Sequence, residues 1–410
     1  MQSSILQSSI DKINMRIAIT GATGLLGSNF LLEVIKRNIN SLQNLKLVIF
    51  GKSKNNISLE KRIRNIIFDE EGKSYLDIYN IDSLNTFFLK NIIFIDLDLD
   101  DENSCLDRTV YKSLNEDPID FFFHIASRTD FRSSPEVRVA VNRTNTDGTR
   151  KILNLVSQIK VLEFIYIGSA YACGRDSGII APDYINLNSE FRNPYELSKL
   201  QAEILVRDFS KRCGVRCRFF RPATICGRLI EKPLGATNKF DVFYSWLAWF
   251  LRMKIKHKSE KHLIYENKVR LDLRVAFNNQ SGLNIVPADF IAKVIYEVCM
   301  QGDKGESYYL VNRSETPHRD YITWMLNYIN IDGVSFVGEI PNAKNKIENF
   351  YYKTVGLIFT PYIDSNPMLF DTSNLDSVLR KAKLHCPPIN ESNFKFLLDY
   401  ARRYDFGLFE

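Results

Sequence analysis

Short apolar runs alternate with longer amphipathic stretches from Met15 to about residue 227. Six of these runs predict buried strands, at residues 16–20, 45–50, 91–95, 120–124, 163–167 and 216–221. Segments of helical length separate them, for example residues 148–159 and 195–213. Strands that are apolar on both faces and alternate with helices are typical of a parallel sheet. The pattern therefore predicts an α/β fold with a Rossmann-type doubly wound parallel sheet.

The regular alternation ends after Gly227, and the remaining chain has a different pattern. Residues 290–300 predict a helix capped by Asp289, and residues 307–311 predict one more strand. Scattered prolines follow, which favour short helices joined by turns, with a last helix at about 392–404.

We therefore expect three parts. Residues 1–14 form a flexible tail, residues 15–227 form the Rossmann domain, and residues 228–410 form a smaller, mostly helical substrate-binding lobe. Because one predicted strand lies beyond residue 228, we expect this lobe to be partly interwoven with the sheet.

Composition places the chain among folded proteins, with 45% hydrophobic and 25% charged residues in 410. The net charge of +6 is too small and too scattered to indicate a nucleic-acid partner. Seven cysteines occur without a C-x-x-C pair or nearby histidine pair, so we expect free thiols, no metal site and a reducing compartment. The N-terminus does not resemble a signal peptide, and the longest apolar stretch is too short to span a membrane. These features predict a cytoplasmic protein.

The strongest local signal is a glycine-rich turn between the first strand and the first helix. Gly21, Gly24 and Gly27 have the spacing G-x-x-G-x-x-G. Glycines let the backbone turn sharply and approach a pyrophosphate, which the helix N-terminus attracts. The position of this turn on the first strand of the alternation predicts a dinucleotide site.

The end of the second strand indicates which dinucleotide. NAD enzymes place a carboxylate there for the ribose hydroxyls, but residues 50–54 contain none. They contain Lys52 and Lys54, which could pair with a 2′-phosphate, with Arg62 as a helper. Two solvated loop lysines would be the plain alternative. The sequence favours NADP(H), and with it an NADP-binding role for the Rossmann domain.

A second signal comes from Tyr195 and Lys199, four residues apart and therefore on one helix face. The lysine ammonium is expected to lower the pKa of Tyr195, which would serve as a proton donor to a carbonyl oxygen. Ser169 ends the fifth strand and would offer a hydroxyl to the same oxygen. A tyrosine and a lysine at this spacing often occur by chance. The presence of Ser169 at the end of the fifth strand strengthens the interpretation of this pair as catalytic.

With these motifs the chain resembles an extended short-chain dehydrogenase/reductase, from Arg16 to about Asn312. The resemblance implies that Ser169, Tyr195 and Lys199 are catalytic, and that Asn145, in a segment similar to the family's N-V-x-G-T, completes the proton relay. Together with the motifs above, it implies a cofactor site formed by Gly21, Thr23, Gly24, Leu25, Leu26, Gly27, Lys52, Lys54, Arg62, Asp98, Leu99, His124, Ala126, Lys199, Pro222, Ala223 and Thr224. For the Asp98–Leu99 pair, Asp96–Leu97 is a competing register.

Within that family the likeness is greatest to fatty acyl-CoA reductases and thioester-reductase domains. Ser169-Ala170-Tyr171 is similar to their S-T-A-Y, and residues 286–289 resemble their V-P-V-D. Residues 228–285 are only loosely similar. The likeness implies reduction of an acyl thioester, carried by coenzyme A or by a separate acidic acyl carrier protein, to an aldehyde or alcohol. The alternatives are a ketone or aldehyde reductase, a nucleotide-sugar epimerase or dehydratase, and a non-catalytic NADP-binding regulator.

An aromatic segment at 240–250 precedes a basic run that includes Lys254, Lys256, Lys258 and Lys261. It could be a lid, a membrane-surface helix or a core helix, and the core helix is favoured; membrane contact is not expected. The aromatic residues could also line a tunnel for an apolar chain, with the basic run attracting phosphates or acidic helices.

Overall fold

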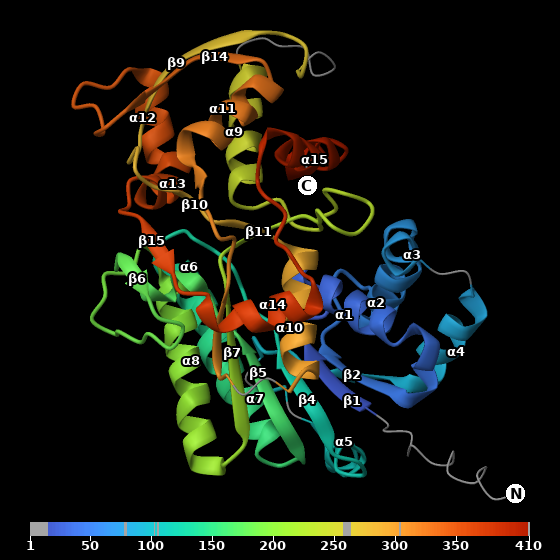
Figure 1. Ribbon diagram of the computed structural model, residues 1–410. Coiled ribbons are helices and arrows are strands. Elements are labelled where there is room, and N and C mark those ends of the chain that lie inside the picture. Colours follow the sequence, from blue (N-terminus) through green and yellow to red (C-terminus); the bar gives the residue numbers. More distant parts are fainter. Residues whose placement is uncertain are drawn as a thin grey trace, which may run out of the picture.

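The computed structural model describes residues 15–77, 80–101, 103–104, 106–256, 264–302 and 305–408. At its centre lies a sheet of seven parallel strands (Figure 1), in the spatial order β12 (Ser307–Leu310), β7 (Arg216–Pro222), β5 (Val161–Ile167), β4 (Ile119–His124), β1 (Met15–Thr20), β2 (Leu45–Gly51) and β3 (Ile92–Asp96). All six strands predicted from the apolar runs are present. The doubly wound parallel sheet is confirmed, and the run at 307–311 supplies its seventh strand beside β7.

Helices cover both faces of the sheet. On one face, α1 (Leu25–Arg37) and α10 (Ala288–Met300) pack against each other and against the strands. On the other face lie α7 (Gly148–Val156) and α8 (Pro194–Cys213). Successive residues of a strand point to opposite faces, so Ile17 and Ala18 of β1 join different cores. This two-sided burial explains why the strand sequences are apolar throughout.

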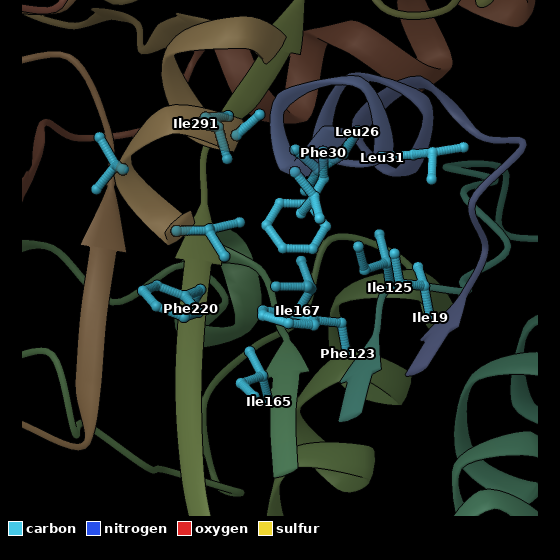
Figure 2. Close-up of a cluster of buried hydrophobic side chains, with 14 of the residues drawn as sticks. Ile19, Leu26, Phe30, Leu31, Phe123, Ile125, Ile165, Ile167, Phe220 and Ile291 are labelled. Atoms are coloured by element: carbon cyan, nitrogen blue, oxygen red, sulfur yellow. The ribbon is translucent and has the colours of Figure 1, made fainter. Parts of the chain in front are cut away.

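Figure 2 shows the core beneath α1, where helix side chains meet strand side chains. The rings of Phe30 on α1 and Phe123 on β4 lie 4.3 Å apart between centroids. Ile167 of β5 and Phe220 of β7 belong to the same cluster, and both are buried. This packing fixes the first turn of α1 over the carboxyl ends of the central strands, where the candidate site lies.

Shorter elements complete the sheet region. They are α2 (Leu59–Phe68), α3 (Glu70–Leu76), α4 (Ile81–Asn91), α5 (Arg108–Leu114), α6 (Pro135–Val141), α14 (Asp376–Ala382), and the two-stranded pairs β6 (Gly178–Ile180) with β15 (Met368–Phe370) and β8 (Thr224–Cys226) with β11 (Ile285–Pro287). No helix in the described ranges is long and apolar enough to cross a membrane.

A second hydrophobic core, separate from the sheet, is built by the C-terminal part of the chain. Its elements are α9 (Phe243–Lys256), α11 (His318–Tyr328), α12 (Lys346–Lys353), α13 (Val355–Ile363), α15 (Glu391–Arg402), the parallel pair β9 (Val269–Ala276) with β14 (Ile331–Val337), and the short pair β10 (Gly282–Leu283) with β13 (Thr316–Pro317). Figure 1 shows this lobe above the carboxyl ends of the central strands. β12 and α10 also come from beyond residue 228, but β12 is a strand of the sheet and α10 packs against the face of the sheet.

The aromatic segment forms the helix α9, which is part of the second hydrophobic core; this confirms the favoured interpretation as a core helix. Lys254 on this helix does not belong to an exposed basic run, contrary to the expectation, because its side chain is fully buried. Lys254 Nζ donates to the carbonyls of Asn267 at 2.6 Å and Ile329 at 2.5 Å, so it ties neighbouring segments to the helix. Lys256 is exposed, whereas Lys258 and Lys261 lie outside the described residues.

Asp289 also differs from its predicted role as a helix cap. Helix α10 begins at Ala288, one residue earlier, and Asp289 is fully buried in its first turn. Its carboxylate accepts the backbone N–H groups of Ile230 and Glu231, each at 2.7 Å. The aspartate therefore fastens the loop after β8 to α10, a contact between segments about 60 residues apart.

Candidate active site

A cavity of about 590 Å³ opens where the parallel strands end. On the sheet side, the cavity is lined by residues at the carboxyl ends of β1, β2 and β5 and by residues in the segments that follow β1, β2, β3, β4 and β5. Residues 222–225, at the end of β7 and just after it, complete this side. This edge of an open α/β sheet is where such folds bind nucleotides. The remaining wall is supplied by the C-terminal lobe, from residues 239–246 and from α11 and α13.

Most of the predicted site residues meet in this cavity. Those that line it are Gly21, Thr23, Gly24, Leu25, Leu26, Gly27, Lys52, Lys54, Arg62, Asp98, Leu99, Ala126, Ser169, Tyr195, Lys199, Pro222, Ala223 and Thr224. His124 and Asn145 do not line it. Within the described ranges, no group of three His, Cys, Asp or Glu side chains is placed to hold a metal ion.

The glycine turn leaves room for a ligand at the start of α1. Gly21 has a φ of +73°, and a Cβ there would lie 2.6 Å from the backbone nitrogen of Ala126. A Cβ on Gly27 would overlap the Gly21 carbonyl. Gly24 precedes the helix and no side chain caps its first N–H groups, which lie at the cavity. An open helix N-terminus with a close backbone approach fits a pyrophosphate.

At the end of β2, Lys52 is not the free positive charge that the sequence led us to expect, but is paired with carboxylates. Lys52 Nζ lies 2.8 Å from an Asp98 carboxylate oxygen and 3.1 Å from one of Asp100. Burial alone would lower the pKa of Lys52, but these two carboxylates outweigh it and raise the pKa. The lysine charge is therefore already compensated before any phosphate arrives. Lys54 lines the cavity and is exposed.

Arg62, like Lys54, has no carboxylate contact among the described residues, and hydrogen bonds hold its side chain in place. Its guanidinium donates to the Lys52 carbonyl at 2.9 Å and to the Thr23 hydroxyl at 2.7 Å. Burial lowers its pKa, and no opposing charge offsets that effect. These two hydrogen bonds hold the guanidinium between the glycine turn and the end of β2, on the cavity wall.

Tyr195, Lys199 and Ser169 converge at the opposite end of the cavity. Asn193 caps α8 by accepting the N–H of Glu196 at 3.1 Å, so the helix starts just before Tyr195. Lys199 follows one turn later on the same face, and both side chains line the cavity. Ser169, after β5, shares a hydrogen bond with the Tyr195 hydroxyl. The three groups can therefore act on one carbonyl.

The electrostatics of this group correct the prediction that Lys199 lowers the pKa of Tyr195. Burial raises the tyrosine pKa well above its usual value, and the hydrogen bond with Ser169 only partly opposes this. Lys199 Nζ donates instead to the Ile167 carbonyl at 2.6 Å. Burial also lowers the pKa of Lys199 to about 7, although the charge of Glu203 opposes this effect. The charged form of the lysine is therefore less favoured than in an exposed lysine.

His124 does not line the cavity, and its place in the cofactor site stays a prediction. It joins two threonines, with Thr20 Oγ1 2.8 Å from Nδ1 and Thr149 Oγ1 3.0 Å from Nε2. Thr149 donates to the Asn145 carbonyl at 2.6 Å, so we assign the Nε2 proton as the donor to Thr149. Burial lowers the histidine pKa to about 3, and the ring is neutral. His124 therefore positions β1, β4 and α7 relative to one another.

Asn145 also sits one layer behind the cavity, in the π-helical turn η2 (Asn142–Asp147). Its side-chain oxygen accepts the Arg128 N–H at 2.8 Å and the Ser127 hydroxyl at 3.1 Å. Its amide donates to the Ser198 hydroxyl at 2.9 Å. The side chain thus connects the loop after β4 with α8, next to the helix turn that carries Tyr195 and Lys199.

Several lining residues were not predicted. The ring of Phe131, after β4, meets Tyr195 edge-on at 5.3 Å and Tyr362 of α13 at 6.1 Å. Near them Lys239 Nζ pairs with an Asp241 carboxylate oxygen at 2.7 Å. These residues come from loops and from the irregular region after Gly227, where no periodic pattern marks a position as facing a cavity. The available signal for Phe131 was a single aromatic residue in the segment that follows a predicted strand end.

The chain is similar to a plant reductase over part of its length. "Probable fatty acyl-CoA reductase 5" of Arabidopsis thaliana is 25% identical over 182 residues, which are 44% of this chain and 35% of that protein. The chain thus matches about a third of the length of that plant relative.

Two solved structures share the fold. The terminal R domain from the myxalamid PKS-NRPS biosynthetic pathway superposes with a TM-score of 0.69 at 20% identity, covering 96% of this chain and 91% of that one. UDP-glucuronic acid 4-epimerase from Bacillus cereus, solved in complex with NAD, gives 0.59 at 16% identity, covering 95% and 97%.

The male sterility protein family matches residues 19–295, which is more than half of the chain. The match begins within β1, before the glycine turn, and extends into α10, so it includes every segment that lines the strand side of the cavity. The chain therefore belongs to the male sterility protein family, a group of NAD(P)-dependent oxidoreductases built on the extended short-chain dehydrogenase/reductase fold.

Proposed function

We propose that this chain is an NADPH-dependent reductase of an acyl thioester, delivered on coenzyme A or on a separate acidic acyl carrier protein. The observation that carries the proposal is the meeting of Ser169, Tyr195 and Lys199 in one cavity with the glycine turn. A largely aromatic wall from the C-terminal lobe completes that cavity and suits an apolar acyl group. The likeness to a fatty acyl-CoA reductase and to an R domain supports this substrate class.

The residues have distinct tasks in this reaction. The nicotinamide, when bound, supplies hydride to the carbonyl carbon. Ser169 donates a hydrogen bond to the carbonyl oxygen, and Tyr195 gives that oxygen its proton. A tyrosine whose pKa is raised by burial remains protonated at neutral pH, so the proton is available when negative charge develops. Loss of the thiol then leaves an aldehyde, and a second reduction gives an alcohol.

The preference for NADPH rests on the corner at the end of β2. Arg62 is held on the cavity wall without a carboxylate contact among the described residues, and Lys54 adds a second positive charge. A guanidinium can pair with a phosphate through two parallel hydrogen bonds. Lys52 contributes less, because Asp98 and Asp100 already compensate its charge.

A cytoplasmic location is part of the proposal. The six cysteines in the described part of the chain are free, which suits a reducing compartment. A substrate on coenzyme A or on a carrier protein would be met there.

The test measures thiol release and NADPH oxidation together. The protein is incubated with NADPH and, in parallel, with acyl-CoAs, acyl-carrier thioesters, ketones and aldehydes. We expect one thiol released for each acyl group reduced, and no activity on ketones. Tyr195→Phe should bind NADPH normally by calorimetry and lose roughly 10²–10⁴-fold in kcat. Turnover of ketones alone would make the protein a carbonyl reductase of a biosynthetic intermediate.

A nucleotide-sugar epimerase or dehydratase is the second candidate, favoured by the fold shared with UDP-glucuronic acid 4-epimerase. The carboxylates of Asp98 and Asp100 beside Lys52 would also suit ribose hydroxyls. The aromatic wall opposes this candidate, because a sugar needs polar partners there. Conversion of a UDP-sugar without net oxidation of added cofactor would favour the epimerase.

A further inference from the structure

The wall that the C-terminal lobe gives to the cavity is charged and partly exposed at the mouth and apolar and buried in the interior. Lys239 and Asp241 form an ion pair, and their side chains are 38% and 30% exposed, so this part of the wall reaches solvent. The lining residues on α9, α11 and α13 are aromatic or aliphatic, and all of them except the half-buried Tyr362 are almost completely buried. An acyl group that enters past the ion pair therefore meets an apolar interior.

That interior ends on a pair of stacked rings. Trp246 of α9 and Phe359 of α13 lie 5.2 Å apart between centroids with their planes 15° from parallel. Tyr321 of α11 meets the tryptophan edge-on at 6.5 Å. All three line the cavity, and Trp246 is 1% exposed. Three helices of the lobe thus each place one ring at the same point.

The space behind these rings is filled. Phe250 and Tyr351 stack near Trp246, each at 6.3 Å, and both are fully buried without lining the cavity. They belong to the second hydrophobic core, which continues to α15. A chain that reaches Trp246 therefore has no passage beyond it, since protein interiors are close-packed.

We propose that the Trp246–Phe359 stack is the floor of the acyl site and restricts this enzyme to short or compact acyl groups. The inference rests on the proposed thioester reduction and names the part of the acyl group that the site accepts. The volume agrees with it. One drug-sized ligand fills pockets of about 300–1,000 Å³, and here about 590 Å³ must hold both a dinucleotide and the acyl group.

The experiment compares substrate profiles of Trp246→Leu and the unaltered protein. Straight-chain acyl-CoAs of about 4 to 16 carbons are reduced with NADPH, and kcat/KM is plotted against length. We expect the unaltered protein to lose activity steeply beyond a short optimum. Trp246→Leu should move the optimum to longer chains, with a gain of about fourfold in kcat/KM for each additional methylene that enters the vacated space.

Trp249→Leu is the matched control. Trp249 lies on the same helix, is 6% exposed and does not line the cavity, so its replacement creates a similar defect elsewhere in the lobe core. Its profile should keep the original optimum. Phe359→Leu removes the other ring of the stack, on α13, and should shift the optimum in the same direction as Trp246→Leu. This second variant keeps the test decisive if Trp246→Leu folds poorly.

Each result bears on one claim. Efficient reduction of 16-carbon thioesters by the unaltered protein, or equal shifts in Trp246→Leu and Trp249→Leu, overturns the proposed floor while thioester reduction stands. Absence of turnover with every thioester, together with turnover of ketones or UDP-sugars, overturns the proposed function itself. A shifted optimum in both floor variants and not in the control supports the inference.

Discussion

Replacing Arg62 by alanine is expected to remove most of the proposed preference for NADPH over NADH. The guanidinium is fixed by the Thr23 hydroxyl and the Lys52 carbonyl, and no carboxylate among the described residues competes for it. It therefore has donors left for a phosphate on the adenosine ribose. NADH lacks that phosphate, so its affinity should depend little on this side chain.

The size of the effect follows from the contacts. A hydrogen bond involving charged groups contributes about 1.5–3 kcal/mol, which corresponds to roughly 10–150-fold in a dissociation constant. Arg62 is only partly buried, so solvent screening favours the lower part of that range. We expect the Kd for NADPH to rise roughly 10–30-fold and the Kd for NADH to change less than about threefold.

Isothermal titration of both cofactors into the variant and the unaltered protein measures the ratio directly. Lys54→Ala serves as the control, because Lys54 lines the same corner but is exposed. A single exposed charge contributes about 0–1 kcal/mol, so the ratio should change less than about fivefold. An unchanged NADPH-to-NADH ratio in Arg62→Ala, or a larger loss in Lys54→Ala, would refute the assignment.

Three further outcomes are expected. Gly21→Ala should abolish cofactor binding in calorimetry, because its Cβ would lie 2.6 Å from the Ala126 nitrogen at a positive φ; retained affinity would contradict the tight turn. Lys254→Met should lower the urea-unfolding free energy by about 1–3 kcal/mol by leaving buried carbonyls unpaired, whereas Arg252→Met on the exposed side should change it by less than about 0.5 kcal/mol. Burial lowers the pKa of His318 to about 3, so the folded state resists protonation and stability falls as pH drops from about 6.5 towards 3, by up to about 1.4 kcal/mol per pH unit. His318→Phe should make the fall of the unfolding free energy with decreasing pH less steep, although buried His124 still contributes its own share; equal steepness in the variant and the unaltered protein would count against this role of His318.

The strands and the glycine turn could be predicted because their chemistry is local. A strand covered by helices on both faces must be apolar at nearly every position, as β1 is, and this leaves an unbroken run in the sequence. The turn needs glycine at Gly27 because a Cβ there would overlap the Gly21 carbonyl, and at Gly21 because its φ is +73°. Parallel strand ends then place the following residues at one edge.

The roles of single charged residues could not be predicted, because they depend on distant partners. Lys254 looks like part of a solvated basic run, but its ammonium meets carbonyls from residues 267 and 329. Lys52 looks available to a phosphate until Asp98 and Asp100 are seen beside it. In each case the spacing along the helix or loop is the same whether the side chain points to water or to the core.

The wall that the C-terminal lobe gives to the cavity could be predicted only in part, for a related reason. The sequence allows residues 240–250 to form either a core helix or a tunnel lining, and it marks neither Tyr321 nor Phe359 as lining a cavity. Trp246, Tyr321 and Phe359 lie on three helices separated by long stretches of chain, and each fits an ordinary amphipathic pattern. Helix periodicity separates a buried face from an exposed one, but it does not separate core packing from the lining of a cavity. That distinction exists only once the helices are assembled.

The charges of Tyr195 and Lys199 are best understood as a pair. Burial opposes a lone phenolate and a lone ammonium alike, which is why the tyrosine pKa is raised and the lysine pKa is lowered to about 7. In the proposed reaction, proton donation by Tyr195 would create a negative charge one helical turn from Lys199, and that charge would favour the protonated lysine. The two ionisations therefore support each other only when the proton has left the tyrosine. If the proposed reaction holds, the predicted influence of Lys199 on Tyr195 acts during reduction, when the carbonyl oxygen takes the proton, and not in the resting site.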